Sequence, residues 1–476
     1  MLVDIAYLDQ THLVIERLPS ILERQRRAFT ANPYPDSEAR LQWLEALHDL
    51  LATHQQAVID AISQDFGHRS ADETRLAEIM PSLHGIRHAQ RHLRRWMKSS
   101  SRAVGLAFQP ARARVIYQPL GVVGIIVPWN YPLYLAIGPL TGALAAGNRV
   151  MLKMSEATPA AGQLLKQLLG QIFAEDQVAV VLGEADVAIA FSRLPFDHLL
   201  FTGSTHVGRQ VMRAAADNLT PVTLELGGKS PAIVSAKVPI AHAAERIAFG
   251  KTLNAGQTCV APDYVLVPRQ HRDEFVEAYR QAVCRFYPTL TGNPDYTSII
   301  NPHHFARLRG YLDDARAKGA RVLPLHDDAQ GRRMPHCLVL DVNEQMTLMQ
   351  DEIFGPLLPV VPYDTLDDAL AYVNGRPRPL ALYYFGYDKA EQRRVLYETH
   401  AGGVCLNDTL LHVAQHDLPF GGIGPSGMGQ YHGREGFQTF SKAKGVLARQ
   451  RFNATRLIYP PYGRPLQRLI TRLFVR

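Results

Sequence analysis

Residues 113–132 read ARVIYQPLGVVGIIVPWNYP, two runs rich in β-branched residues that proline and glycine interrupt. Such runs are typical of strands. The next segment, LYLAIGPLTGALAAGN at 133–148, predicts a helix that packs closely through glycine and alanine. RVMLKMSE at 149–156 then predicts another short strand. Strand, helix and strand in this order indicate a βαβ unit in a mainly parallel sheet.

The same alternation continues on the C-terminal side of this unit, whereas the N-terminal side predicts helices. Apolar residues recur every three or four positions within residues 11–98, as at Leu41, Leu44, Leu47 and Leu51. The chain shows no internal repeat and no low-complexity linker, so we expect an α/β protein whose domains interleave. The C-terminal side predicts a helix at 158–172 and strands at 177–183, 197–204 and 221–228. The same alternation of strands and helices returns at 231–250 and 259–345.

Length and composition exclude several classes of protein. A chain of 476 residues is too long for one ordinary core, so two or more domains are expected. The net charge of +7 comes with no basic run interleaved with aromatic residues, so no nucleic-acid partner is expected. The N-terminus lacks the apolar core of a signal peptide, and no 18-residue apolar segment predicts a membrane span.

The four cysteines indicate a reducing compartment, for which we predict the cytoplasm. Their spacing shows no CxxC pair and no cysteine–histidine cluster, so neither a disulfide framework nor a metal site is expected. These cysteines are Cys259, Cys284, Cys337 and Cys405.

Three residues in separate motifs are candidates for acyl chemistry through a thioester. Cys259 lies in NAGQTCVAPDY, among small, polar and turn-forming residues that suggest a thiol held on a loop. Glu225 ends an apolar run in TLELGGKSP, where partial desolvation would raise its pKa toward the range of a general base. Asn130, in VPWNYPL, is a candidate donor to an oxyanion. The alternative for Asn130 is the N-cap of the following helix.

A second set of motifs suggests a nucleotide. LLFTGSTHVG at 199–208 places Gly203 and Ser204 after a strand and Gly208 at a helix start, which suits a phosphate. GIGPSG at 422–427 matches GxGxxG, but a poor strand precedes it, proline lies inside it and no βαβ unit follows. We therefore interpret it as a glycine-rich loop.

Four further positions carry weaker signals when each is taken alone. Lys153 and Glu156, at the end of a strand in VMLKMSEATP, could contact the phosphate or ribose of a nucleotide, or could be solvated surface charges. Glu352 and Phe354 precede a Gly-Pro turn in DEIFGPLLPV. A phenylalanine in such a place is most often a core residue.

Together these motifs resemble the aldehyde dehydrogenase superfamily. PWNYP, FTGSTHVG, LELGGKSP, GQTC and EIFGP match its signatures in the same order, and the resemblance covers roughly residues 40–445. GQTCVAPDYVL and FGGIGPSGMGQYHGREGFQTFS are similar to the class 3 branch, which includes fatty, aromatic and coniferyl aldehyde dehydrogenases. One departure is Met154, where class 3 members commonly have proline.

The resemblance implies oxidation of an aldehyde to the acid, with NAD as cofactor and NADP possible. Cys259 would be the nucleophile and Glu225 the general base, while Asn130 and the main-chain N–H of Cys259 would hold the oxyanion. Lys153 and Glu156 would contact the adenosine ribose, and Gly203 and Ser204 the pyrophosphate. Glu352 would hold the nicotinamide ribose and Phe354 would flank the nicotinamide. The full set of expected cofactor residues is Trp129, Lys153, Glu156, Gly203, Ser204, Gly208, Glu352 and Phe354.

Two other functions compete with this one. A thiol hydrolase or acyltransferase would keep the thiol, carboxylate and amide but would need no nucleotide motif. A catalytically inactive member of the fold would not need the cysteine and glutamate. The substrate stays open between an aromatic or cinnamyl aldehyde and a medium- or long-chain aliphatic one, because pocket walls come from scattered loops.

The resemblance also implies a domain organisation and a homodimer. A Rossmann-like NAD-binding domain would contain 1–226 and 418–440, with a hairpin at 103–119 for oligomerisation. An α/β catalytic domain would contain 227–417, and 441–476 would form an oligomerisation strand and tail. In that tail Leu466, Leu469, Ile470, Leu473 and Phe474 predict one apolar helical face, with arginine at 464, 468, 472 and 476. This helix would pack on the partner subunit or lie on an anionic membrane surface.

Overall fold

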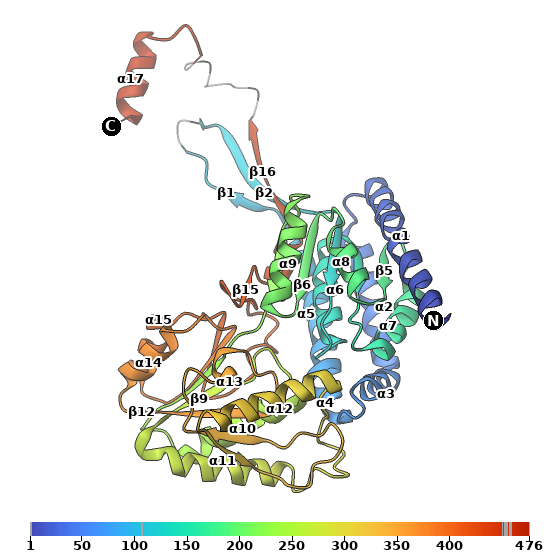
Figure 1. The fold of residues 1–476 in the computed structure, drawn as a ribbon. Helices are drawn as coiled ribbons and strands as arrows, with labels where there is room; N and C mark the ends of the chain where they lie inside the picture. Colours follow the sequence, from blue (N-terminus) through green and yellow to red (C-terminus); the bar gives the residue numbers. More distant parts are fainter. Residues whose placement is uncertain (1, 106–107, 450, 452–455, 457–458, 476) are drawn as a thin grey trace.

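The computed structural model describes residues 2–105, 108–449, 451, 456 and 459–475. Three sheets organise these residues, two of them in the body of the molecule and one in an arm that projects from it (Figure 1). The predicted α/β class is confirmed. Two residues of the expected 103–119 hairpin, 106 and 107, lie outside the described residues.

Helices dominate the N-terminal part of the chain, as the periodicity predicts. In α2 the apolar stripe that includes Leu44, Leu47 and Leu51 is buried, whereas Leu41 is half-buried. A π-helical turn follows α4, a feature that often marks a functional site. The elements are α1 (Leu2–Ala31), α2 (Ser37–Thr53), α3 (Gln55–Phe66), α4 (Ala71–Thr74), η1 (Arg75–Ile79) and α5 (Met80–Trp96).

A six-stranded sheet contains the βαβ unit predicted from residues 113–156. Its order is β15-β7-β6-β3-β4-β5, and every pair is parallel except β15 with β7. Helix α6 connects β3 to β4 and is buried along nearly its whole length. The strands are β3 (Val122–Ile126), β4 (Arg149–Lys153), β5 (Val178–Val181), β6 (His198–Thr202), β7 (Val222–Glu225) and β15 (Gly427–Met428); the helices are α6 (Tyr134–Ala146), α7 (Pro159–Ile172), α8 (Ala185–Ser192) and α9 (Thr205–Ala216).

The second sheet of the body has seven strands. Its order is β10-β11-β12-β9-β8-β13-β14, parallel except for β10. The strands are β8 (Pro231–Val234), β9 (Tyr264–Pro268), β10 (Arg321–Pro324), β11 (Cys337–Leu340), β12 (Leu357–Tyr363), β13 (Ala381–Phe385) and β14 (Gly403–Leu406). The helices are α10 (Ile240–Thr252), η3 (Leu253–Gly256), η4 (Arg269–His271), α11 (Arg272–Phe286), α12 (Pro302–Ala317), α13 (Thr347–Gln350), α14 (Leu366–Asn374) and α15 (Lys389–Glu398).

The third sheet and the last helix form an arm that extends away from the body (Figure 1). Strand β2 (Ala111–Pro119) pairs antiparallel with β1 (Ser100–Arg102) on one side and β16 (Ser441–Arg449) on the other. Helix α16 (Gly433–Thr439) leads into β16, and α17 (Pro465–Phe474) ends the arm. The helix expected in the tail is confirmed; Arg476 and the side chain of Phe474 lie outside the described residues.

The glycine-rich loop 422–427 fixes the edge of the six-stranded sheet. It leads into β15, whose Gly427 pairs with Glu225, and the N–H of Leu226 donates to the carbonyl of Ser426 at 3.1 Å. A Cβ on Gly427 would lie 2.3 Å from the carbonyl oxygen of Leu224, so only glycine fits this contact. The loop therefore supports the strand end at Glu225. No helix in the described part of the chain is both long and apolar enough to cross a membrane.

Candidate active site

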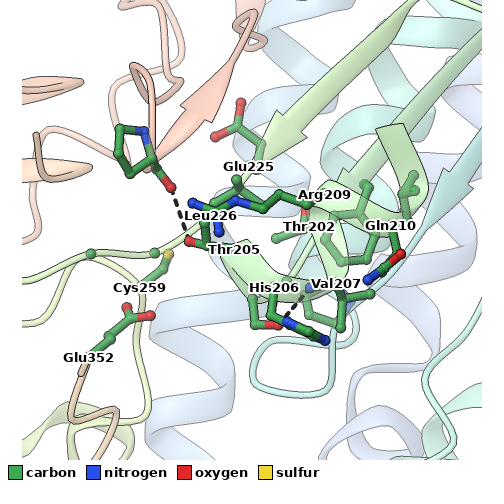
Figure 2. Close-up of a pocket in the computed structure, with 18 of the residues that line it drawn as sticks. Thr202, Thr205, His206, Val207, Arg209, Gln210, Glu225, Leu226, Cys259 and Glu352 are labelled. Carbon is green, nitrogen blue, oxygen red and sulfur yellow. Dashed lines mark hydrogen bonds between the residues drawn. The ribbon is translucent and has the colours of Figure 1, made fainter. Parts of the chain in front are cut away.

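A cavity of ≈ 1630 Å³ lies between the two sheets of the body. The carboxyl ends of four parallel strands of the six-stranded sheet face segments on the side of the seven-stranded sheet. Residues at or just after the ends of β3, β4, β6 and β7 form one wall. Ligand sites in open parallel sheets lie at such strand ends. Figure 2 shows Glu225, Cys259 and Glu352 together with residues from the start of α9 around this cavity.

Cys259 lies on the loop that follows the 3₁₀ turn η3, as its sequence context predicts. The side chain is half-buried and lines the cavity. Burial raises the pKa of the Cys259 thiol, and the carboxylates of Glu352 and Glu225 raise it further, while its own N–H and that of Val260 oppose the shift. The thiol is therefore protonated at neutral pH, so forming the nucleophilic thiolate requires a proton acceptor.

Glu225 ends β7 and reaches the same cavity. The residue is only 2% exposed, and both carboxyl oxygens are buried without a hydrogen-bond partner in the described parts of the chain. Burial raises the pKa of Glu225 well above its usual value. A desolvated carboxylate without protein partners is suited to exchange protons with a thiol or a water molecule.

Asn130 does not cap a helix, so the alternative interpretation of this residue is wrong. Helix α6 begins at Tyr134 with Leu133 as its N-cap, and no side chain of the cap residue bonds to the helix. The Asn130 side chain is buried and lines the cavity, and its Nδ2 donates to the main-chain carbonyl of Gln257 at 3.2 Å. This bond ties the amide to the residue two positions before Cys259.

The start of α9 has the features of an anion site. Ser204 is the N-cap, and its hydroxyl accepts from the N–H of Val207 at 3.3 Å. Gly203 and Ser204 line the cavity, so the positive end of the helix faces it. Gly208 is buried and is not among the lining residues. A Cβ there would lie 2.6 Å from Leu226, so this glycine allows α9 to pack closely on the segment after β7.

Lys153 and Glu156, the two charged residues after β4, lie in different surroundings. Glu156 lines the cavity, as expected for a residue at the ribose. Lys153 is fully buried, and its ammonium donates to the carbonyls of Met154 and Gly183, both at 2.7 Å. It is absent from the lining residues, so its contact with the ribose stays a prediction.

Glu352, Phe354 and Trp129 gather in the cavity near Cys259. Burial, together with the charge of Asp263, raises the pKa of Glu352 to about 8, and one of its oxygens is buried without a partner among the described residues. Gly227 faces this carboxyl group closely enough that a Cβ would lie 1.9 Å from it. The Trp129 and Phe354 rings meet edge to face with centroids 5.3 Å apart.

These features fit a dinucleotide. The N-terminus of α9 suits a pyrophosphate, the unpartnered oxygen of Glu352 suits a ribose hydroxyl, and Gly227 leaves room for that carboxyl group. Each ring of the aromatic pair offers an apolar face against which a planar ring can pack.

Sequence reasoning missed several residues of the cavity. His304 and Arg307 come from the first turns of α12, where the His304 ring lies 4.9 Å from Trp129 and Arg307 donates to the carbonyl of Phe354 at 3.4 Å. Burial lowers the pKa of His304 to about 4, so the ring is neutral. In the sequence NPHHFARLRGYL only the Asn-Pro helix start gives a signal, and it indicates a helix rather than a site.

Three buried tyrosines interact electrostatically with the reactive thiol. Tyr134, Tyr383 and Tyr431 are buried, and their pKa values are raised by burial and also by interaction with Cys259. The Tyr134 hydroxyl lies 3.3 Å from Nε2 of His432, and the Tyr383 hydroxyl donates to the carbonyl of Val260. The tyrosines are far apart in sequence, at the start of α6, in β13 and after β15.

The model that describes the aldehyde dehydrogenase family matches residues 16–446. The chain is 69% identical to a probable coniferyl aldehyde dehydrogenase of Pseudomonas aeruginosa over the whole of both chains. It is 41% identical to aldehyde dehydrogenase family 3 member B1 of Rattus norvegicus, covering 93% of this chain and 94% of the relative. A crystal structure of a Mycobacterium tuberculosis aldehyde dehydrogenase complexed with NAD+ aligns with a TM-score of 0.83 at 29% identity, covering 92% of this chain and 91% of the other.

Proposed function

This chain belongs to the class 3-like branch of the aldehyde dehydrogenase family, and we propose that it oxidises a coniferyl-type aromatic aldehyde to the acid. It is an NAD(P)-dependent aldehyde dehydrogenase. The observation that carries the aromatic substrate is the name of the 69% identical relative, a probable coniferyl aldehyde dehydrogenase.

Cys259 is proposed as the nucleophile that attacks the aldehyde carbon. Its proton would pass to a water molecule in the cavity, which leaves Glu225 free to act as the base of the later hydrolysis. Sulfur then adds to the carbon and the carbonyl oxygen becomes an oxyanion. Nδ2 of Asn130 and the N–H of Cys259 would donate to that oxygen.

Oxidation and release complete the reaction. When bound, NAD supplies the acceptor for the hydride that leaves the carbon of the thiohemiacetal, which becomes a thioester on Cys259. Glu225 would then remove a proton from water, which adds to the thioester carbon. The Cys259 sulfur is then expelled and takes that proton back from Glu225, which gives the carboxylic acid and restores both the thiol and the carboxylate.

The cofactor is proposed to lie across the cavity from α9 to Cys259. Gly203 and Ser204 would contact the pyrophosphate, Glu156 the adenosine ribose and Glu352 the nicotinamide ribose. Trp129 and Phe354 would flank the nicotinamide. A thiol hydrolase would not need this wall, so its presence favours the dehydrogenase.

The arm is proposed to join two subunits as a homodimer in the cytoplasm. Its sheet ends in two edge strands, β1 and β16, within the described residues, and an exposed edge is an aggregation liability unless another chain covers it. We propose that residues 1–226 and 418–440 form the cofactor-binding domain and residues 227–417 the catalytic domain. Residues 103–119 and 441–476 would join the two subunits.

A substrate panel tests the proposed function. NADH formation at 340 nm would be followed with coniferaldehyde, benzaldehyde and decanal. The expected result is the highest kcat/KM with coniferaldehyde. A higher value with decanal would assign the enzyme to long-chain aliphatic aldehydes, while no NADH with any of the three would contradict the substrate class altogether.

A further inference from the structure

A buried cluster of charged residues lies behind the loop that contains Asn130. The Arg69 side chain is fully buried, and its Nη1 donates to Glu78 at 2.7 Å and to the main-chain carbonyl of Asn130 at 3.1 Å. The other oxygen of Glu78 accepts from the N–H groups of Leu133 at 2.8 Å and Tyr134 at 3.1 Å. Glu78 therefore caps the start of α6, the role that sequence reasoning considered for Asn130.

A second carboxylate in the cluster holds the loop that contains Cys259. Glu73, also buried, accepts from the N–H of Asn254 at 3.0 Å and from the hydroxyl of Thr297. Nδ2 of Asn254 donates to the carbonyl of Asn130 at 3.1 Å and to that of Gln257 at 3.2 Å. The carbonyl oxygen of Asn130 therefore accepts from two buried groups. One is Arg69, and the other is Asn254 in the segment just before Cys259.

The segment that Glu73 holds has an unusual backbone. Asn254, Ala255 and Gly256 have φ values of 53°, 51° and 73°, so three successive residues adopt left-handed conformations just before Cys259. Such conformations persist in residues other than glycine only where the surroundings hold them. Here the N–H and side chain of Asn254 are bound from both sides, and a Cβ on Gly256 would lie 2.4 Å from the carbonyl of Gly355.

We propose that Arg69, Glu73 and Glu78 are positioning residues that hold the Asn130 amide and the Cys259 loop at the separation required for oxyanion stabilisation. This rests on the proposed function of Asn130. The three residues precede the sheets in sequence, and through them one short segment of the N-terminal helices reaches both loops. A small displacement of an oxyanion donor lowers the reaction rate strongly. Loosening this cluster should therefore slow the formation of the thioester.

The competing explanation is that the cluster contributes only to stability. Buried ion pairs often contribute little net stability, but removing one partner leaves an unpaired buried charge and is strongly destabilising. Burial raises the pKa of both Glu73 and Glu78, while Arg69 opposes each shift, which shows how strongly these charges depend on one another. A test must therefore separate loss of folding from loss of positioning.

Arg69→Lys is the primary variant. A lysine keeps the positive charge, but its ammonium lies one bond short of the position of Nη1, the atom from which Arg69 donates to both Glu78 and the Asn130 carbonyl. Arg40→Lys is the matched control, because Arg40 is equally buried and donates to the carbonyls of Ala145 and Ala146 at the far end of α6. If Arg69→Lys does not fold, Glu73→Gln replaces it, since a glutamine has one accepting oxygen and can keep only one of the two bonds from Asn254 and Thr297.

The measurements are the rate of the pre-steady-state NADH burst, the Kd for NAD and the melting temperature. We expect Arg69→Lys to slow the burst about 10-fold at saturating substrates while the Kd for NAD is unchanged. Arg40→Lys should lower the melting temperature and leave the burst rate unchanged. An unaltered burst in folded Arg69→Lys would overturn the positioning role.

A double-mutant cycle with Asn130→Ala shows whether Arg69 acts through the amide. If it does, Arg69→Lys should slow the burst by less than about twofold once Asn130 is alanine. Losses that multiply in the double variant would overturn the proposal, because Arg69 would then act elsewhere. A normal burst in Asn130→Ala alone would overturn the oxyanion role of Asn130 and the positioning role that depends on it.

Discussion

The cavity around Cys259 and the arm formed by β16 and α17 depart from ordinary globular structure in opposite ways. In the cavity, polar groups are buried without a hydrogen-bond partner among the described residues, as in both carboxyl oxygens of Glu225. On the arm, apolar groups are exposed: Leu469 and Leu473 of α17 are 54% and 63% exposed. An unsatisfied buried carboxyl group is costly and points to chemistry, whereas a run of exposed apolar side chains points to association.

This difference predicts two separable sets of effects. Substitutions in the cavity should change turnover without changing the oligomeric state. Changes to the arm should alter association and leave the chemistry of each folded subunit intact. A substitution that altered both properties would show that the two regions depend on each other.

The largest effect is expected from Cys259→Ala. Removing the thiol removes the covalent step, so kcat should fall on the order of 10³-fold or more. The Kd for NAD, measured by protein fluorescence, should change little, because the thiol is not a proposed cofactor ligand. Cys284→Ala is the control, since this half-buried cysteine contacts Leu325 away from the cavity. Substantial turnover by Cys259→Ala would contradict the nucleophile assignment.

Glu225→Gln should separate the two halves of the reaction. Deacylation requires an activated water and hydride transfer does not, so we expect an NADH burst followed by turnover slowed about 10²- to 10⁴-fold. Stopped-flow absorbance at 340 nm measures both phases. Loss of the burst itself would show that Glu225 is needed earlier, to accept the proton of Cys259. Glu38→Gln, at an exposed ion pair with Arg94, should behave like the parent enzyme.

The pH profile provides an independent test of Glu225. Only the carboxylate form can remove a proton, and burial raises the pKa of this group, so the active form is lost as pH falls through that raised value. The deacylation rate should therefore decline at a higher pH than an exposed glutamate would allow. A flat profile down to the usual pKa of a glutamate would contradict the assignment of this base.

A smaller effect is expected from Glu156→Gln. A carboxylate at the adenosine ribose repels the 2′-phosphate of NADP, so its neutralisation should raise kcat/KM for NADP relative to NAD by a few-fold, about the effect of one exposed charge. Glu184→Gln is the matched control, because Glu184 also interacts with Lys153 but does not line the cavity. An unchanged ratio in Glu156→Gln would place the ribose away from this residue.

Sequence patterns point to strand-end residues that line the cavity, and the reason is physical. Glu225, Gly203 and Glu156 come at or just after the ends of buried strands, and parallel strand ends meet at one edge of a sheet. A local motif therefore carries three-dimensional information at these positions. Cys259 also lines the cavity, and its sequence context suggests it for a different reason, since the polar, turn-forming residues around it do not suit a core.

The supporting residues could not be found in this way. Arg69 and Glu78 lie in HRSADETRLAE, which has the composition of an exposed helical surface, yet both side chains are fully buried. Arg69 reaches Asn130, and Glu78 reaches Leu133 and Tyr134, only because the N-terminal helices pack against a segment about sixty positions later. His304 likewise enters the cavity from α12. Such contacts depend on tertiary packing. The periodicity of one sequence does not show which distant residue a side chain will contact.

The smallest effect on catalysis is expected from truncation to residues 1–460, which removes α17. Within α17, Leu466, Leu469 and Leu473 are exposed, on a helix that also carries Arg468 and Arg472. If this face packs on the partner subunit, sedimentation velocity at micromolar concentration should show weaker dimerisation, while kcat stays unchanged. If it lies on a membrane instead, the intact protein should float with anionic vesicles at low salt and the truncated protein should not.

A full-length chain that sediments only as the 53.0 kDa monomer would contradict the proposed homodimer. A large fall in kcat of the truncated enzyme would break the separation between cavity and arm.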